Sequence, residues 1–212
     1  MKYFDIIFLD LDGPILDGKF RHYQCYVDIV NKYGGEVIGI DEYWGMKRER
    51  VPRDVILRKT AFGSTYQDYY SEWMSNIENP EYLKLDVLKP NVIETLKQWV
   101  TLSEQLILIT MRQNMDHLVC QLKALEIYSL FDEVILCPPI NNNTKYDLLK
   151  NKKFSSAIFI GDTEEDSNTA KKLNIKMIGI TNGLRNREHL EADYYFNEIN
   201  AIDFFSLSTT LD

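Results

Sequence analysis

Two aspartates, Asp10 and Asp12, stand one residue apart directly after an apolar stretch near the start of the chain. Residues 3–9 are predicted to form a buried strand, and Gly13-Pro14 ends it with a turn. The two carboxylates are therefore expected at the carboxyl end of a central strand, where open α/β sheets bind ligands. Aspartate also commonly punctuates such turns without any function. Because two close negative charges repel unless a cation or a shared proton relieves them, the pair predicts a metal ion.

A second acidic group follows another apolar stretch. Residues 157–160 are expected to form a buried strand, Gly161 allows a tight exit, and Asp162 and Asp166 lie at the start of a helix. Helix capping alone would favour acidic residues there, because the helix dipole and its unpaired N–H groups attract them. If this strand lies beside the first, however, Asp162 faces Asp10 across the end of the sheet. Three carboxylates then form an all-oxygen site suited to Mg²⁺.

Two further strand ends supply a hydroxyl and an ammonium group. Thr110 closes a predicted strand over residues 106–109, and Lys145 begins a helix after a predicted strand over residues 133–136. Taken singly, a threonine after a strand is common and Lys145 could be a solvated surface lysine. Together with the carboxylates, four strand ends carry groups suited to phosphate and magnesium, and this joint pattern is more specific than its parts.

The elements that must position these groups alternate between helix and strand from residue 90 onward. Helices are predicted over residues 91–102, 114–127, 144–150 and 163–173, and the last clear strand over residues 176–180. Strands that alternate with helices predict a parallel sheet covered on both faces. The expected fold class is therefore α/β, with the strand ends that carry polar groups gathered at one edge.

The segment after the first strand has a different character. Residues 19–88 contain no convincing strand, and the spacing of their apolar residues predicts helices over residues 20–33, 41–48, 52–60 and 65–77. The predicted organisation is an α/β core of residues 1–18 and 89–212 with a helical insertion of residues 19–88.

Composition narrows the possible partners and location. The 212 residues include 45% hydrophobic and 26% charged residues, as in a soluble globular protein, and the net charge of −8 argues against nucleic acid as a partner. No apolar run approaches the length of a membrane span, and no signal-like leader precedes the first strand. The three cysteines fit neither a zinc nor a disulfide spacing. We expect a cytoplasmic protein that is a monomer or a weak dimer.

Taken in order, these groups resemble the haloacid dehalogenase superfamily of phosphotransferases: Asp10-Leu11-Asp12-Gly13, the strand ending at Thr110, Lys145, and Gly161-Asp162 followed by Asp166. The resemblance spans nearly the whole chain, and residues 161–190 look especially like the phosphoglycolate phosphatase members. It implies a Rossmann-like parallel sheet with an inserted helical C1 cap. It also implies magnesium-dependent hydrolysis of a small phosphomonoester, such as phosphoglycolate or a sugar phosphate.

The resemblance further implies a role for each acidic residue. Asp10 would be the nucleophile that forms an aspartyl phosphate, and Asp12 the general acid and base. Mg²⁺ would be held by Asp10, the main-chain carbonyl of Asp12 and Asp162, with Asp166 supporting its waters or orienting Lys145. The dehalogenases of the superfamily lack a carboxylic acid at the position of Asp12, because a halide leaves without a proton. Asp12 therefore favours a phosphate ester, and we reject dehalogenation.

Thr110 and Lys145 would bind the phosphoryl oxygens in such an enzyme. Met111 and Arg112, which follow Thr110 directly, are further candidates for substrate binding. Lys145 is followed by Tyr146, whereas many relatives have a proline shortly after the lysine. Lys150, Lys152 and Lys153 therefore stand as alternatives for the phosphate-binding lysine.

The helical insertion offers its own candidates. His22 resembles the cap histidine of β-phosphoglucomutase, which raises the alternative of phosphate transfer within a sugar; the absence of lysine between residues 60 and 83 counts against it. Lys47 and Arg48 belong to a basic run that either forms a solvated face or reads a second anionic group of the substrate. A catalytically idle binding protein of the same fold is a third alternative, disfavoured because a scaffold gains nothing from clustered carboxylates.

Overall fold

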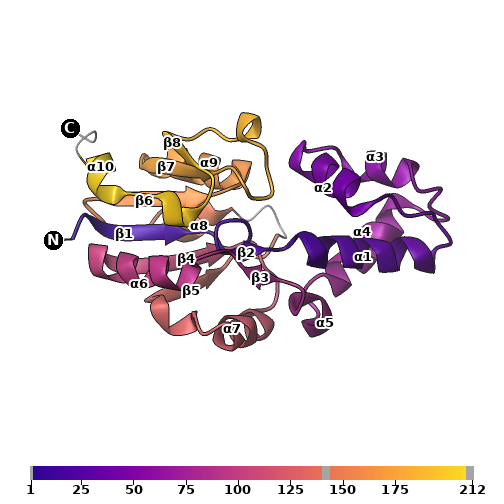
Figure 1. The fold of residues 1–212 in the computed structure, drawn as a ribbon, viewed down its shortest axis with the longest axis horizontal. Helices are drawn as coiled ribbons and strands as arrows, with labels where there is room; N and C mark the ends of the chain where they lie inside the picture. The colour runs from indigo at the N-terminus through magenta and orange to yellow at the C-terminus, as the bar shows by residue number, and fades with distance from the viewer. Residues whose placement is uncertain (1, 140–143, 209–212) are drawn as a thin grey trace. The chain divides into compact units, whose positions relative to one another are not determined.

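The computed structural model describes residues 2–139 and 144–208, and the chain forms two units. The core unit comprises Met1–Leu16 and Leu88–Asp212, and the helical unit comprises Asp17–Val87 (Figure 1). The chain passes between them at two short strands, β2 (Leu16–Asp17) and β3 (Val87–Leu88), which pair with each other.

The core unit contains a six-stranded sheet in the order β5-β4-β1-β6-β7-β8, and every described pairing is parallel. Its strands are β1 (Phe4–Leu9), β4 (Ser103–Thr110), β5 (Glu133–Leu136), β6 (Ala157–Gly161), β7 (Lys176–Ile180) and β8 (Tyr194–Phe196). The central strands are continuous apolar runs because both faces of the sheet are covered. The predicted α/β class and parallel sheet are confirmed.

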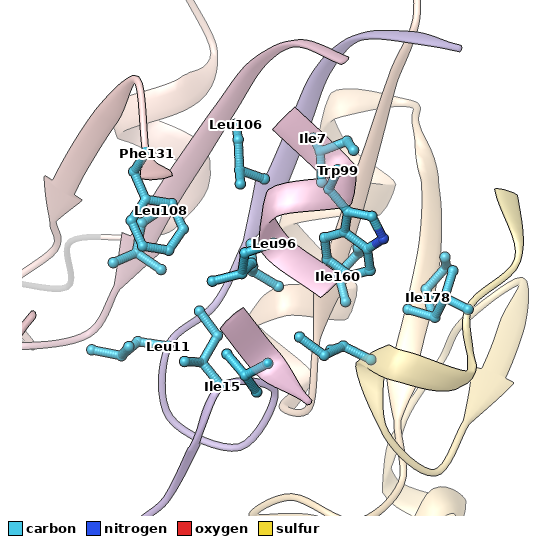
Figure 2. Packing of buried hydrophobic residues seen from close by; sticks show 14 of the residues in the cluster. Ile7, Leu11, Ile15, Leu96, Trp99, Leu106, Leu108, Phe131, Ile160 and Ile178 are labelled. Carbon is cyan, nitrogen blue, oxygen red and sulfur yellow. The ribbon is translucent and has the colours of Figure 1, made fainter. Parts of the chain in front are cut away.

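Helices connect the strands and cover the sheet. They are α6 (Val92–Leu102), α7 (Met115–Ala124), α8 (Lys145–Leu149), α9 (Glu164–Leu173) and α10 (Phe204–Ser208), with single 3₁₀ turns at Tyr128–Leu130, Arg187–His189 and Ile199–Ala201. Successive side chains of β1 belong to two separate hydrophobic clusters. Ile7 and Leu9 lie in the first cluster, and Ile6 and Phe8 lie in the second. In the first cluster Leu96 and Trp99 of α6 pack on the sheet (Figure 2).

The helical unit has its own buried core. Its helices are α1 (Lys19–Lys32), α2 (Ile40–Arg48), α3 (Arg53–Arg58), α4 (Tyr66–Asn76) and α5 (Pro80–Leu83). Tyr26 of α1, Tyr43 of α2 and Trp73 of α4 belong to one hydrophobic cluster. A buried ion pair with a distance of 2.7 Å between Arg21 Nε and Asp86 Oδ1 links the two ends of the unit.

Several short elements were not predicted from the sequence. They are strands β2, β3 and β8 and helices α5 and α10, each of two to five residues, which is too few to show a period. Strand β4 begins at Ser103, three residues before the predicted start, because its first three residues are polar and do not extend the apolar run. In the described part of the chain, no helix is long and apolar enough to cross a membrane.

Candidate active site

The register of the central strands brings the predicted site residues to one edge of the sheet. Leu9 of β1 pairs with Leu108 of β4 on one side and with Ile160 of β6 on the other. Asp10 therefore follows β1 between the ends of β4 and β6, and its N–H donates to the carbonyl of Ile160 at 2.9 Å. The strand of residues 157–161 thus lies beside the first strand, as the predicted site requires.

Three buried carboxylates meet at this edge. Asp10, Asp162 and Asp166 each offer an oxygen, and these oxygens all lie within 4.8 Å of one another. Burial raises the pKa of Asp10 to about 7, although the ammonium group of Lys145 opposes the shift. Burial also raises the pKa of Asp162 well above its usual value, and the charges of Asp10 and Asp166 add to this effect. The cluster therefore favours additional positive charge.

Lys145 provides part of that charge. Its Nζ lies 2.7 Å from Asp10 Oδ1 and 2.6 Å from Asp166 Oδ1, and its side chain is only 1% exposed. Burial alone would lower the pKa of Lys145, but the two carboxylates outweigh it and the pKa is raised. The alternatives lie on other parts of the surface: Lys150 pairs with Asp147, Lys152 pairs with Glu133, and Lys153 is exposed.

Asp166 has two tasks in this arrangement. Its Oδ2 accepts hydrogen bonds from the N–H groups of Asp162 and Thr163, at 3.1 and 3.0 Å, and from the Thr163 hydroxyl. This is the capping box that begins α9, so the capping interpretation holds for this residue. Because its other oxygen binds Lys145, Asp166 also fixes the position of the lysine.

Asp162 is held by main-chain groups instead. Its Oδ2 accepts from the N–H of Leu184, and a Cβ added at Gly13 or Gly183 would lie 1.9 or 2.0 Å from that oxygen. Gly13 also has a φ of +107°, which side chains rarely adopt. Among the described residues, the buried Oδ1 of Asp162 has no hydrogen-bond partner. Two glycines and the N–H of Leu184 thus surround one oxygen of Asp162, Oδ2, and its other oxygen, Oδ1, is left to bind a cation.

The donor set fits a hard divalent ion. Asp10 and Asp162 supply carboxylate oxygens, one of them without a partner, and oxygen is the ligand that Mg²⁺ prefers. The third carboxylate of the cluster is Asp166, which was predicted as a supporting residue and whose oxygens already bind Lys145 and the N–H groups at the start of α9. The main-chain carbonyl of Asp12 stays a predicted ligand.

Asp12 and Arg112 form a contact that the sequence did not predict. Arg112 Nε donates to Asp12 Oδ2 and Arg112 Nη2 donates to Asp12 Oδ1, both at 2.7 Å. Near them, the Thr110 hydroxyl is buried and has no hydrogen-bond partner within the described part of the chain. Met111, between the two, is half-buried. The site thus contains the carboxylate of Asp12, which is paired with Arg112, and the hydroxyl of Thr110, which can donate to a ligand.

Comparison with known proteins agrees with this geometry. The profile of the haloacid dehalogenase-like hydrolases matches residues 6–180, which include every strand-end group described above. The chain belongs to the haloacid dehalogenase-like hydrolase family. The resemblance inferred from the motifs is therefore confirmed. A search of curated proteins finds no match.

Solved structures share the fold of this haloacid dehalogenase-like chain at low sequence identity. A haloacid dehalogenase-like hydrolase from Streptococcus pneumoniae is 21% identical with a TM-score of 0.67, and the match covers 97% of this chain and 98% of that one. A predicted phosphoglycolate phosphatase from Haemophilus somnus is 18% identical with a TM-score of 0.73, covering 98% and 99%. At such identities the similarity establishes the fold alone.

The helical unit of this haloacid dehalogenase-like chain brings two of its three candidates together. Lys47 Nζ lies 2.7 Å from His22 Nδ1, and the His22 ring packs 5.5 Å from that of Trp73. Arg48 ends α2 beside Lys47 and is half-buried. A lysine from α2 thus contacts His22, whereas the sequence argument considered only the absence of lysine between residues 60 and 83, which it counted against the phosphomutase alternative. Helix packing, which spacing does not reveal, supplies the pair.

Proposed function

We propose that the protein is a magnesium-dependent phosphatase that hydrolyses the phosphomonoester of a small metabolite through an aspartyl phosphate. The observation that supports it best is the meeting of Asp10, Asp162 and Lys145 at one sheet edge, with Asp12 two residues beyond Asp10. A carboxylate nucleophile, an oxygen site for a cation and an ammonium group are the parts that phosphoryl transfer requires. The helical unit is proposed to act as the cap that selects the substrate.

In the first step an oxygen of Asp10 bonds to phosphorus while the bond from phosphorus to the ester oxygen breaks. The leaving alkoxide takes a proton from Asp12. In the second step Asp12 accepts a proton from water, whose oxygen bonds to phosphorus while the bond from phosphorus to the Asp10 oxygen breaks. This releases phosphate and restores the Asp10 carboxylate.

The surrounding residues stabilise the charge that moves during these steps. Lys145, already in contact with Asp10, and the Thr110 hydroxyl would hold the phosphoryl oxygens. Asp166 keeps Lys145 in place. Mg²⁺ held by Asp10, Asp162 and the carbonyl of Asp12 would supply positive charge that offsets the repulsion between the carboxylate and the phosphate.

Phosphate release from a panel of phosphomonoesters, with Mg²⁺ and with EDTA, tests this proposal. We expect release only with the metal, and none from the Asp10→Asn variant. Asp5→Asn is the matched control, because Asp5 lies at the opposite end of the same strand and binds the N–H groups of Ser155 and Ser156. Undiminished release by Asp10→Asn, or release in EDTA, would contradict the mechanism.

A phosphomutase like β-phosphoglucomutase is the second candidate, and the contact between His22 and Lys47 favours it. Because an ammonium group only donates, Nδ1 of His22 accepts and Nε2 carries the proton. Such a ring can donate to a sugar hydroxyl. Conversion of a hexose 1-phosphate to the 6-phosphate, followed by ³¹P NMR and lost in His22→Asn, would favour this candidate; release of free phosphate alone would exclude it.

A further inference from the structure

The contact between Arg112 and Asp12 is the starting point, and its place follows from the sheet. Strands β1 and β4 are neighbours, Asp12 lies three residues beyond the end of β1, and Arg112 lies two residues beyond the end of β4. The Arg112 side chain is 3% exposed, and two of its nitrogens donate to the two oxygens of Asp12. This is a bidentate pair, the geometry in which guanidinium recognises carboxylate most specifically.

The pair conflicts with the role proposed for Asp12. A carboxylate whose two oxygens both accept from a guanidinium is held in its charged form, so it has no proton to give to a leaving alkoxide. Arg112 must therefore release at least one oxygen of Asp12 when a phosphate ester is bound. A buried guanidinium that loses its carboxylate without replacement is strongly destabilised. Release is therefore most favourable when a second anion takes the place of Asp12 on the guanidinium group.

The other buried cation of the site, Lys145, does not supply an anion-binding group on the same side as Asp12. Lys145 is held between Asp10 and Asp166, on the side of the site where the phosphoryl group is expected. Arg112 is paired with Asp12, the proposed acid for the leaving group, so we expect an anion that binds Arg112 to belong to the alcohol part of the ester. Its planar fork fits a carboxylate better than it fits a hydroxyl group, which presents a single oxygen.

We propose that Arg112 binds a carboxylate of the substrate, and that Asp12 takes the place of this carboxylate in the free protein. The inference rests on the proposed function and specifies its substrate class: phosphate esters of small hydroxy acids, in preference to esters of neutral alcohols. Binding exchanges one carboxylate for another on the same guanidinium, so Arg112 stays paired throughout. The exchange also frees Asp12, which can then take a proton from solvent and pass it to the leaving alkoxide, and this makes Arg112 a specificity residue.

Two non-hydrolysable probes test the exchange by binding alone. 3-Phosphonopropionate carries a phosphonate and a carboxylate, and propylphosphonate carries a methyl group in place of the carboxylate. Isothermal titration with Mg²⁺ present gives the ratio of their dissociation constants. Because hydrogen bonds to charged groups each change affinity by about 10- to 100-fold, we expect the wild type to prefer the carboxylate probe by at least about tenfold.

The variants separate recognition from mere positioning. In Arg112→Gln the ratio should fall to about one, and in Arg112→Lys, which keeps the charge but loses the fork, it should be intermediate. Arg185→Gln is the matched control, since Arg185 Nε contacts both oxygens of Glu164 in the same unit and should leave the ratio as in the wild type. Thermal unfolding of each variant verifies that it is folded before titration.

The outcomes distinguish this inference from the proposed function. A wild type that binds both probes equally, or an Arg112→Gln variant that keeps the wild-type ratio, would overturn it. If Arg112 only positioned Asp12, the variants would slow the release of phosphate from charged and neutral alkyl esters alike and leave the probe ratio unchanged. Absence of phosphate release from every ester would contradict the proposed function instead, whatever the probe ratio.

Discussion

The two units of the molecule hold the cations of their candidate site residues in different ways, although the helical unit also contains the buried pair of Arg21 and Asp86. In the core unit, Lys145 and Arg112 lie against carboxylates at the ends of parallel strands. In the helical unit, Lys47 and Arg53 lie over the ring of Trp73, with distances to its centroid of 5.1 and 5.0 Å. Breaking an ion pair inside a buried site costs about 3–5 kcal/mol, whereas a cation over an aromatic ring contributes about 0.5–1 kcal/mol at an exposed position. This difference fits the proposed roles, with the chemistry in the core unit and substrate selection in the helical unit.

Replacing Lys145 tests the first arrangement with the largest expected effect. Lys145→Met leaves Asp10 and Asp166 without their ammonium partner, and breaking a buried pair costs about 3–5 kcal/mol of unfolding free energy. Loss of a preorganised cation should also lower kcat by about 10²- to 10³-fold. Urea unfolding and phosphate release measure the two effects. Lys150→Met, on the exposed surface of the next turn, should change neither, and a similar loss there would refute the assignment.

The glycines of the two units give the second contrast. Gly183→Ala places a methyl group on Asp162 Oδ2, and disturbing a residue that supports a metal ligand weakens metal binding by about 10- to 100-fold. A Cβ at Gly45, within α2, meets no atom within 4 Å, so Gly45→Ala should raise stability by about 0.5–1 kcal/mol. Calorimetric titration with Mg²⁺ and urea unfolding provide the readouts. Equal Mg²⁺ affinity in Gly183→Ala and the wild type would argue against Asp162 as a ligand.

The carboxylate cluster also predicts a dependence of stability on pH. The pKa of Asp10 is raised by burial from 3.8 to about 7, so between these values the folded protein binds a proton that the unfolded chain has lost. The stability that this proton contributes is complete below pH 4 and is lost as the pH rises to about 7. The metal-free wild type should therefore lose Tm across this range more steeply than Asp10→Asn.

Mg²⁺ should counteract this loss, because it competes with the proton for the same carboxylates. A ligand at 100 times its Kd stabilises the fold by about 2.7 kcal/mol, so saturating Mg²⁺ should raise Tm clearly at pH 7.5 and little at pH 5. Differential scanning calorimetry at both pH values measures the shift. An equal Mg²⁺ shift at the two pH values would mean that the ion binds elsewhere.

The sequence predicts the strands of the core unit better than it predicts the contacts between side chains from different elements. Strands β5 and β7 have the bounds expected from their apolar runs. Because the strands are parallel, the residues that follow their carboxyl ends lie at one edge of the sheet. The contact of Arg112 with Asp12 depends on the path of two loops, and that of His22 with Lys47 on the packing of two helices. Neither leaves a period in the sequence. The approach of Gly13 and Gly183 to Asp162 likewise joins segments far apart in the chain.

Lys47 offers the smallest expected effect and the most direct counterpart to Lys145. Its ammonium group contacts His22 Nδ1 and lies over Trp73, and cation–π contacts of this kind contribute about 0.5–1 kcal/mol. Lys47→Met should therefore lower the free energy of unfolding by no more than about 1 kcal/mol, as measured in urea. If the helical unit selects the substrate, the variant should raise KM for anionic esters with little change in kcat, because binding common to ground and transition states is lost. A fall in kcat as large as that of Lys145→Met would instead place the lysine of the helical unit in the chemistry, as the phosphomutase alternative requires.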